Sequence, residues 1–308
     1  MILRLHLIVL LLLCAGGVGA QGQDSAPWDR DLQVVAAMLA GGFDNANQSY
    51  FDLRGDRSIK HRRYHIDVDR IDAPALGEYV FFASSYWDSD EQLSAGDYLW
   101  ILSADDDAQA VRMETWRVAT SNEADTLIAG TAIEGKASCD VLWRREAAQF
   151  RGTVEMACEI PMPDDFVLSA GQLWVTVPEV DNGSFQMNRI RNFECYADIP
   201  GVGGGRDIPY DRYEDIRIHD QGGAAWFTSK EGRRLGVSLF LVDWPINNYE
   251  GIFTRDSFVI YVSEEIDGER KEHGYAFTIP EADRIGINLK WMLASCFMKS
   301  NRFATPAM

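Results

Sequence analysis

The sequence predicts a mainly β protein with one helix at its start, and three observations lead to this fold class. Only the first segment after residue 27 shows helical spacing of apolar residues. Further short apolar segments then follow at intervals of roughly ten residues, which indicates an antiparallel barrel or sandwich. Within Ser138–Ile160, strict alternation is typical of a strand with one buried side. Its apolar face consists of Phe150, Gly152, Val154, Met156, Cys158 and Ile160.

The helix is predicted to begin at Asp31, whose side chain can cap the first turn. Its apolar positions lie on one helical face. They are Leu32, Val35, Ala36, Leu39 and Phe43. Gly41 and Gly42 follow the periodic stretch and are expected to end the helix.

Strands are predicted next along the chain, each bounded by polar or glycine-containing turns. They cover residues 57–71, 79–86, 98–103, 111–118, 138–160 and 167–177. Ala170 and Gly171 interrupt the last of these segments, which predicts a turn or bulge there.

The glycine-rich stretch Gly201–Arg206 is not a phosphate loop, because no Lys-Ser or Lys-Thr pair follows it. It is expected to be a flexible connection to a second β-rich unit. In that unit, Leu235–Val242 is expected to be a strand. Asp267-Gly268 predicts the turn of a hairpin between residues 258–263 and 275–279. Strict alternation from Ile285 to Leu293 predicts a further strand.

Residues 1–20 are interpreted as a secretory signal peptide rather than as part of the fold. Arg4 precedes an apolar run, and Val18-Gly19-Ala20 supplies small residues before a cut that leaves Gln21 first. The mature chain is therefore expected to be secreted or periplasmic. Lipid attachment at Cys14 is the weaker alternative. No other apolar run approaches the ~20 residues that span a bilayer.

The composition narrows the classes of partner. A formal net charge of −18 argues against nucleic acid and against anionic membrane surfaces. Five cysteines, one of them in the leader, are too few for a disulfide scaffold, so the fold must depend on its core. Nine Trp, fifteen Phe and eleven Tyr make that core substantial.

The hairpin within residues 138–160 suggests a disulfide. If Ala148 and Gln149 form its turn, Cys139 lies directly opposite Cys158. Opposed strand residues have Cβ atoms about 4.5–5.5 Å apart, which a small adjustment brings within disulfide range. The alternative is two ordinary buried cysteines, and the sequence leaves both open.

Signatures of hydrolases, metal centres and nucleotide sites are absent from the sequence. His61 and His65 have the spacing of ligands on a helix, but they lie in a strand-like segment. There, four residues span about 13 Å, and no third ligand is evident. The acidic run Asp67–Asp72 fails as a calcium loop, because Ile71 occupies a ligand position and no glycine follows it. We therefore predict no metal and no cofactor.

Several motifs resemble the CpcT/CpeT family of phycobiliprotein chromophore lyases. In that family, as here, a Cys opens a strand, a Phe-(Lys/Arg)-Gly-Thr-Val-Glu strand follows (Phe150–Glu155), and a second Cys closes it. Leu32–Ser49 resembles the opening helix of the family and the Phe-x-Asn-x-x-Gln segment after it. Phe166–Val177 resembles a late strand. The resemblance covers about residues 31–214.

The resemblance implies a calycin-like up-and-down barrel, related in shape to lipocalins, that holds one small ligand. It divides the chain into a signal peptide (1–20), a barrel (21–215) and a β-rich C-terminal extension (216–308). It also implies a lyase that holds a linear tetrapyrrole (bilin) and orients it for thioether attachment to a cysteine of an acceptor protein. Whether the chain forms a homodimer is left open.

Five residues on the predicted barrel strands are candidates for binding this ligand. Aromatic rings suit the tetrapyrrole plane, carboxylates accept from its nitrogens, and arginines pair with its propionates. The candidates are Tyr98, Arg112, Glu114, Trp116 and Glu155. Four of them, all but Arg112, match acidic or aromatic positions of the family. The alternative is that they face solvent on the outer side of the strands.

Two departures from the family favour a second hypothesis. The first is that Leu99 and Ile101 stand where the family has the arginines of an Arg-x-Arg strand. The second is that bilin attachment is a cytoplasmic reaction, whereas this chain carries a predicted export signal. The alternative function is a non-catalytic exported calycin that binds an apolar or pigment-like molecule.

Overall fold

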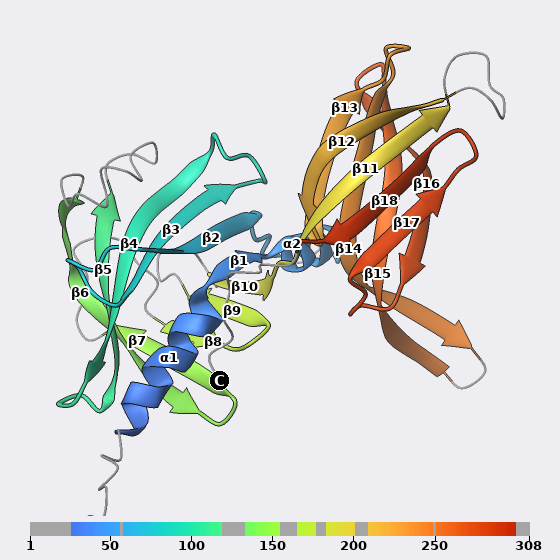
Figure 1. Cartoon of the computed structure of the whole chain (residues 1–308). Helices are drawn as coiled ribbons and strands as arrows, with labels where there is room; N and C mark the ends of the chain where they lie inside the picture. The colour runs from blue at the N-terminus through green and yellow to red at the C-terminus, as the bar shows by residue number, and fades with distance from the viewer. Residues whose placement is uncertain are drawn as a thin grey trace, which may run out of the picture.

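The computed structural model describes residues 26–55, 58–118, 133–154, 165–176, 183–200, 209–248 and 251–299. They form two β-rich bodies that follow each other along the chain, a barrel and a sandwich (Figure 1). The predicted signal peptide lies outside the described residues. Among the described helices, none has the length and apolar character needed to cross a bilayer.

The first body is a closed barrel of ten antiparallel strands, in which β1 pairs with both β2 and β10. The remaining strands pair in chain order. The strands are β1 (Gly41–Asp44), β2 (Tyr64–Ile71), β3 (Tyr79–Trp87), β4 (Ser94–Asp105), β5 (Ala110–Val118), β6 (Ile133–Glu146), β7 (Gln149–Val154), β8 (Asp165–Leu168), β9 (Gln172–Thr176) and β10 (Ser184–Arg189). The predicted mainly β fold with an antiparallel barrel and an N-terminal helix is confirmed.

The N-terminal helix α1 spans Pro27–Leu39 and begins earlier than predicted. Proline fits the first helical turn because its missing N–H has no partner there in any helix. The Asp29 carboxylate accepts a hydrogen bond from the backbone N of Ala26 (3.0 Å), which caps the first turn. Asp31, the predicted cap, instead pairs with Arg145 across 2.6 Å and ties the helix to β6.

The apolar face of α1 packs against the side chains that fill the barrel. Val35, Ala36 and Leu39 are buried in the same cluster as the inward-facing strand residues. Phe43 belongs to this cluster too, but from β1 rather than from the helix. Large side chains dominate the interior: Phe81, Met113, Trp143, Phe150, Leu168 and Leu173 are almost fully buried. The described part of the interior is therefore a packed apolar core.

The hairpin of β6 and β7 turns one residue earlier than predicted, which shifts the partner of each paired residue by two positions. Arg145 pairs with Phe150 and Glu146 with Gln149, so Ala147 and Ala148 form the turn. Two-residue hairpin turns need a positive φ that matches strand twist, and Ala147 supplies it at 56°. A shift of two residues keeps every side chain on its predicted face. Cys158 lies outside the described residues, so the predicted Cys139–Cys158 bridge stays a prediction.

The second body consists of two four-stranded antiparallel sheets that enclose a core of their own. One sheet has the order β12-β11-β18-β17 and the other β13-β14-β15-β16. The strands are β11 (Asn192–Pro200), β12 (Tyr210–His219), β13 (Gln221–Thr228), β14 (Arg234–Asn248), β15 (Gly251–Ile266), β16 (Glu269–Thr278), β17 (Arg284–Asn288) and β18 (Leu293–Met298). We refer to this body as the sandwich.

The boundary between the two bodies falls between β10 and β11, not at residue 215 as predicted. β11 pairs with β12 and β18 and contributes Phe193 and Cys195 to the sandwich core. The glycine-rich segment, which was expected to join the two units, therefore connects two strands of one sheet. The predicted Asp267-Gly268 turn is confirmed, since Ile266 pairs with Glu269.

Two predicted strands prove to be pairs of strands. The interruption expected at Ala170-Gly171 separates β8 from β9. The alternating run Ile285–Leu293 instead ends at Asn288, where a turn leads into β18.

A disulfide that the sequence did not indicate joins Cys195 of β11 to Cys296 of β18. The two residues pair directly across neighbouring strands and both are buried. The bridge thus joins the first and last strands of the sandwich.

Candidate functional site

The structure does not place the predicted ligand-binding residues of β5 inside the barrel. Alternation assigns the inward face to three buried residues: Val111, Met113 and Thr115. The outward face carries the predicted residues Arg112, Glu114 and Trp116. Successive side chains of a strand point to opposite sides of the sheet. Since the apolar face of β5 packs into the barrel core, its polar face points away from that core. Trp116 accordingly packs against a small apolar cluster outside the barrel interior.

The other predicted residues are dispersed as well. The Arg112 guanidinium pairs with Asp105 (2.6 Å) and Asp140 (2.9 Å) on the outer face. Tyr98 packs against the interior cluster. Glu155 lies outside the described residues. The structure therefore does not bring this set together around one ligand.

Leu99 and Ile101, the positions where the resembled family has arginines, also point away from the interior. Leu99 is fully buried in the outer cluster with Val80 and Val118, and Ile101 packs against it. An arginine at position 99 would have to bury its charge among apolar side chains, which is costly without a partner.

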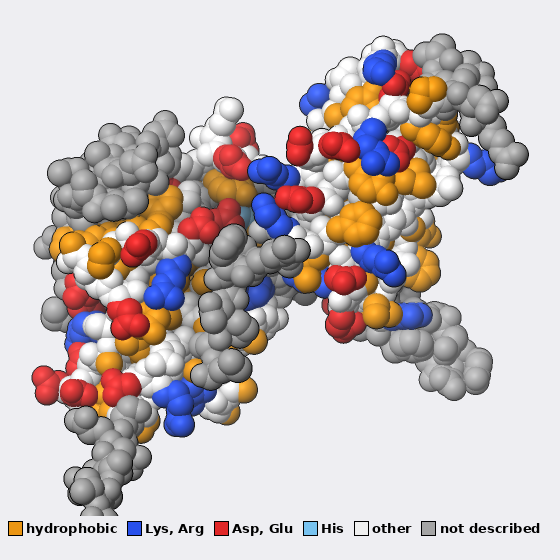
Figure 2. Space-filling model, in the orientation of Figure 1, with side chains coloured by type: hydrophobic (Ala, Val, Ile, Leu, Met, Phe, Trp, Pro, Cys, Tyr) orange, Lys and Arg blue, Asp and Glu red, His pale blue; other side chains and the backbone are white. Residues whose placement is uncertain are grey.

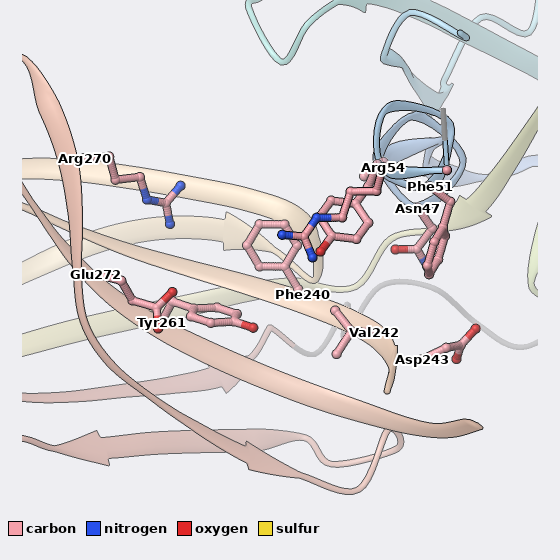
Figure 3. Close-up of a pocket in the computed structure, with 12 residues that line it drawn as sticks. Asn47, Phe51, Arg54, Phe240, Val242, Asp243, Tyr261, Arg270 and Glu272 are labelled. Carbon is pink, nitrogen blue, oxygen red and sulfur yellow. The ribbon is translucent and has the colours of Figure 1, made fainter. Parts of the chain in front are cut away.

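A large open cleft lies where the barrel meets the sandwich. On the face of the molecule drawn in Figure 2, acidic and basic side chains gather over the junction of the two bodies. Its volume is about 810 Å³, within the range of about 300–1,000 Å³ typical of small-molecule sites. One wall is helix α2 (Ala46–Arg54), and the other is the outer face of β14, β15 and β16 (Figure 3). We call this space the interbody cleft.

Alternation along the sandwich strands places aromatic rings in the interbody cleft. Leu239 and Ile260 turn into the sandwich core, so their neighbours Phe240 and Tyr261 face outward. The rings of Phe240 and Tyr261 lie 5.7 Å apart, edge to face. Tyr50 of α2 faces them across the cleft.

Two arginines bring positive charge to the interbody cleft. Arg54 extends from α2 toward Phe240 (Figure 3) and lies 5.3 Å from the ring centroid of Tyr50. Arg270 donates to the hydroxyls of Ser263 and Ser238, both at 3.0 Å. Neither arginine forms an ion pair with a carboxylate among the residues that the structure describes.

The interbody cleft also has carboxylates. Glu272 of β16 and Asp243 of β14 both line it. The cleft thus combines aromatic planes, cationic groups and hydrogen-bond acceptors within one space.

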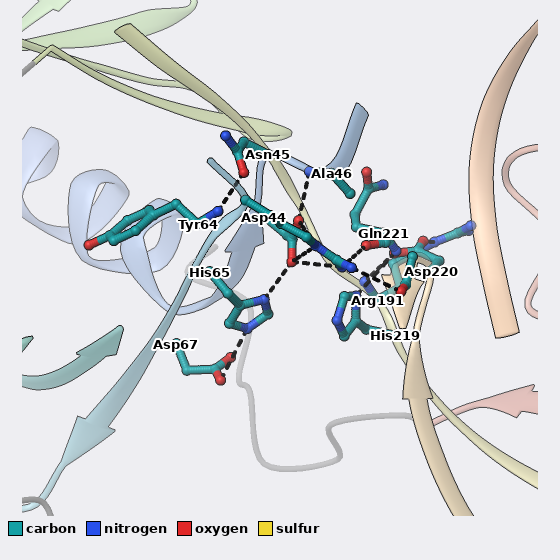
Figure 4. Close-up of polar contacts among 12 residues, drawn as sticks. Asp44, Asn45, Ala46, Tyr64, His65, Asp67, Arg191, His219, Asp220 and Gln221 are labelled. Carbon is teal, nitrogen blue, oxygen red and sulfur yellow. Dashed lines mark hydrogen bonds and ion pairs between the residues drawn. The ribbon is translucent and has the colours of Figure 1, made fainter. Parts of the chain in front are cut away.

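A buried polar cluster lies beside the interbody cleft and spans both bodies (Figure 4). Asp44 of β1 accepts from His65 Nδ1 (2.9 Å) and from Arg63 Nη2 (3.0 Å). The second ring nitrogen of His65 lies 3.2 Å from the carboxylate of Asp67. Arg63 also donates to the backbone O of Gln221 in the sandwich (2.6 Å). We call this set, together with His219, the junction cluster.

Charges within the junction cluster shift the pKa values of its members. Burial alone would lower the pKa of His65, but hydrogen bonds to Asp44 and Asp67 raise it to about 9. Burial would raise the pKa of Asp44, yet His65 and Arg63 together lower it. Burial and then the charge of His65 lower the pKa of His219 to about 4. At neutral pH, His65 is therefore charged and His219 is neutral.

Three members of the junction cluster have atoms of the kind that ligate metal ions. Asp44, His65 and His219 each offer one ligand atom, and these atoms lie within 4.8 Å of one another. Two imidazoles and one carboxylate suit Zn²⁺ or Fe²⁺. However, Asp44 already accepts from Arg63, from His65 and from the backbone N of Ala46 (2.7 Å). A cation would have to displace the His65 proton beside a guanidinium, so the donor set fits a protonated cluster better than a metal centre.

The stability of the protein is expected to peak near pH 6.5 and to fall on both sides. Above the ordinary histidine value of 6.5, the folded state keeps the His65 proton that the unfolded state loses, so stability falls until about pH 9. Below pH 6.5, His219 becomes protonated in the unfolded state but stays neutral in the folded state until about pH 4, so stability falls as the pH falls through this range. Across each of these two limbs of the pH profile, acid and alkaline, the free energy of unfolding changes by about 3 kcal/mol. Urea unfolding from pH 4 to pH 9.5 measures this profile.

Two variants separate these limbs from other titrating groups. His65→Gln should remove most of the alkaline limb, and His219→Asn should flatten the acid limb. A chelator should leave the wild-type profile unchanged, whereas a chelator-sensitive profile would favour a metal. Parallel profiles for the wild type and both variants would contradict the proton assignment.

Sequence reasoning missed both the interbody cleft and the junction cluster. The sequence singled out His61 and His65 as a pair, but His61 lies 2.6 Å from Asp52 instead. His65 meets His219 through the fold, with ring centroids 5.1 Å apart. No local spacing signals such a contact.

In comparisons with known proteins, no family model and no curated protein matches this chain. The resemblance to the chromophore lyases therefore stays a prediction.

Proposed function

We propose that this chain is an exported, non-catalytic binding protein for a planar, conjugated ligand that bears carboxylate groups, such as a linear tetrapyrrole. The proposal places the ligand in the interbody cleft rather than inside the barrel. The observation that carries it is the lining of that cleft, where aromatic rings lie between two arginines that have no carboxylate partner among the described residues.

The chemistry of such a ligand matches the lining group by group. Phe240, Tyr261 and Tyr50 offer rings for stacking on an extended π system. Arg54 and Arg270 suit carboxylates, with which guanidinium groups form paired hydrogen bonds. The net charge of the chain is −18, whereas in the cleft lining Arg54 and Arg270 balance Asp243 and Glu272, so an anion meets less repulsion here than the chain as a whole would exert.

Three features favour binding over catalysis. The described side chains that form the core of the barrel, such as Trp143 and Phe150, are apolar and buried, unlike the charged lining of the interbody cleft. Leu99 and Ile101 belong to an apolar cluster outside that interior. A lyase of this kind must hold the reactive carbon of the tetrapyrrole in one orientation, and the open cleft offers less constraint than an enclosed barrel.

Biliverdin is expected to bind the purified protein with a shifted absorption band, and Arg270→Ala is expected to weaken binding about tenfold or more. A hydrogen bond to a charged group contributes roughly 1.5–3 kcal/mol, and its loss leaves the ligand carboxylate unpaired. Tyr261→Ala should weaken binding less, by a few-fold, because stacking contributes roughly 0.5–1.5 kcal/mol. Spectroscopic titration measures both effects.

Matched controls lie elsewhere on the sandwich. Arg234→Ala removes an exposed arginine of β14, and Tyr210→Ala removes an exposed tyrosine of β12, both outside the cleft lining. Neither should change the affinity. Equal losses in control and cleft variants would contradict the cleft. The lyase hypothesis is tested by co-expressing a chain that lacks residues 2–20 with a bilin pathway and an apo-phycobiliprotein. A covalent, zinc-fluorescent product would favour that hypothesis instead.

A further inference from the structure

The side chain of Arg63 links the two bodies beside the interbody cleft. Arg63 precedes β2 of the barrel, and its guanidinium binds the Asp44 carboxylate through Nε (3.0 Å from Oδ1) and Nη2 (3.0 Å from Oδ2). The same guanidinium reaches the sandwich, where Nη2 lies 2.6 Å from the backbone O of Gln221 and Nη1 lies 3.3 Å from the backbone O of Gly222. One planar group thus holds acceptors of both bodies in a fixed geometry.

On the barrel side, the Asp44 carboxylate connects Arg63 to helix α2, which is one wall of the cleft. Oδ1 of Asp44 also accepts from the backbone N of Ala46, the first residue of α2 (2.7 Å; Figure 4). This bond satisfies a backbone N–H of the first turn, which has no partner within the helix. Ala46 itself lines the interbody cleft. The start of α2 is therefore held by the same carboxylate that binds Arg63.

On the sandwich side, a bulge in β13 presents two consecutive carbonyl groups to Arg63. The register of β13 against β14 shifts between Gln221 and Gly223, and Gly222 has a φ of 77°. Successive carbonyl groups of a regular strand point to opposite edges, so one guanidinium reaches two of them only where the strand is irregular. Gln221 pairs with Phe240, an aromatic residue of the cleft lining. The bulge therefore connects Arg63 to the second wall of the cleft.

The contact between the bodies is tight at Gly222. A Cβ atom at this position would lie 3.0 Å from Cε1 of Phe240, 3.2 Å from Nη2 of Arg63 and 3.5 Å from the Cβ of Ala46. The first two distances are shorter than ordinary van der Waals contacts, so a larger residue would displace its neighbours. Arg63 and one residue from each wall of the cleft therefore meet at a single glycine.

We propose that Arg63 is a positioning residue of the interbody cleft, which sets the separation between α2 and the outer face of β14, β15 and β16. The inference rests on the proposed function and names the contact that prepares the cleft for its ligand. One covalent connection, between β10 and β11, joins the two bodies, and relative motion is the default for bodies joined in this way. Walls that already have the right separation spare the ligand the entropy cost of ordering them.

The distance between the two bodies tests the proposal. Spin labels, carried by a non-natural amino acid at the exposed positions Gln92 of the barrel and Glu231 of the sandwich, report this distance. Arg63→Gln and Arg63→Lys should broaden its distribution about twofold, because neither side chain has the planar fork that reaches both bodies. Arg62→Gln is the matched control, since Arg62 is exposed and pairs with Asp88 within the barrel (2.7 Å). Its distribution should match that of the wild type.

Arg63→Lys separates positioning from stability. Lysine keeps a positive charge beside Asp44, so the midpoint of urea unfolding should lie closer to the wild type for Arg63→Lys than for Arg63→Gln. A purely structural role would restore the distance distribution along with the stability, whereas a positioning role leaves the distribution broad in both variants. Both variants should also bind biliverdin about tenfold more weakly, because binding must then order the two bodies as well.

Gly222→Ala disturbs the same contact from the sandwich side and leaves every charge in place. The added methyl group would press on Phe240 and on Arg63, so the distribution should broaden and biliverdin should bind more weakly. Gly232→Ala is the matched control, because Gly232 has a similar φ of 83° but no atom within 4 Å of its Cβ position. It carries the same backbone strain without the contact, so neither readout should change.

The outcomes separate this proposal from the function on which it rests. Distributions as narrow as that of the wild type in Arg63→Lys and Gly222→Ala would overturn the positioning role, whether or not a ligand binds. Broad distributions with an unchanged affinity for biliverdin would overturn it too, since the separation of the walls would then not matter for binding. If biliverdin does not bind the wild type, the proposed function fails. Broadening in Arg63→Lys but not in Arg62→Gln would still support Arg63 as the residue that sets the separation.

Discussion

Replacement of both Cys195 and Cys296 by alanine is expected to destabilise the sandwich by about 4–5 kcal/mol. The disulfide joins residues 101 positions apart, so it restricts a long loop of the unfolded chain. In the loop-entropy model, a closed loop of this length contributes about 4.7 kcal/mol. The bridge also holds together β11 and β18, the first and last strands of the sandwich. Urea unfolding of wild type and double variant, followed by tryptophan fluorescence, measures the difference.

The reductant provides the control. Dithiothreitol should lower the unfolding midpoint of the wild type toward that of the double variant and leave the double variant itself unaffected. An unfolding midpoint that is the same in wild type, reduced wild type and double variant would contradict the expectation.

The second large effect is expected for Asp44→Asn, which should destabilise the protein by about 3–5 kcal/mol, as is typical when one partner of a buried ion pair is removed. Asp44 is fully buried and is the shared acceptor for His65 and Arg63. Asparagine fits the same space but leaves two cationic groups facing a neutral amide. The measurement is again urea unfolding at pH 7.

Asp67→Asn is the matched control, since the same change of chemistry occurs on a side chain that is 42 % exposed. Solvent screens the Asp67 carboxylate, so its loss should cost clearly less than the loss of the buried Asp44 carboxylate. Asp44→Asn should also shrink the alkaline limb of the pH profile, because the pKa of His65 falls with its main partner removed. Similar losses in both variants would argue against the buried charge as the cause.

The barrel was predictable because its signal is local. Alternation over a few residues indicates a strand, as in Phe150–Val154 of β7, and the pairing of consecutive strands needs no long-range information. The hairpin turn was misplaced because Ala147 and Ala148 have no turn preference; only the backbone shows the positive φ at Ala147. The boundary was placed at residue 215 because the family resemblance extends to about residue 214, and only the pairing of β11 with β12 and β18 shows that the sandwich begins near residue 190.

The candidate site was less predictable, for two reasons. The first is that the polar face of β5 was assigned to a cavity, although Val111 and Met113 on its other face have the apolar character of a core. The second is that the interbody cleft and the junction cluster depend on contacts between segments far apart in sequence. Arg63 reaches the backbone of Gln221, and nothing in the spacing of either residue signals the other.

The boundary between β10 and β11 has a consequence for how the molecule can be divided. Among the described strands none is shared by the two bodies, and each body has its own core, so a cut after Ile190 would sever a single covalent connection. The separated barrel would keep Asp44, His65 and Arg63, but Arg63 would lose its acceptors on the backbone of Gln221 and Gly222. Neither fragment alone would keep both walls of the interbody cleft. The chain is therefore modular in its architecture, while recognition of a ligand is a property of the undivided molecule.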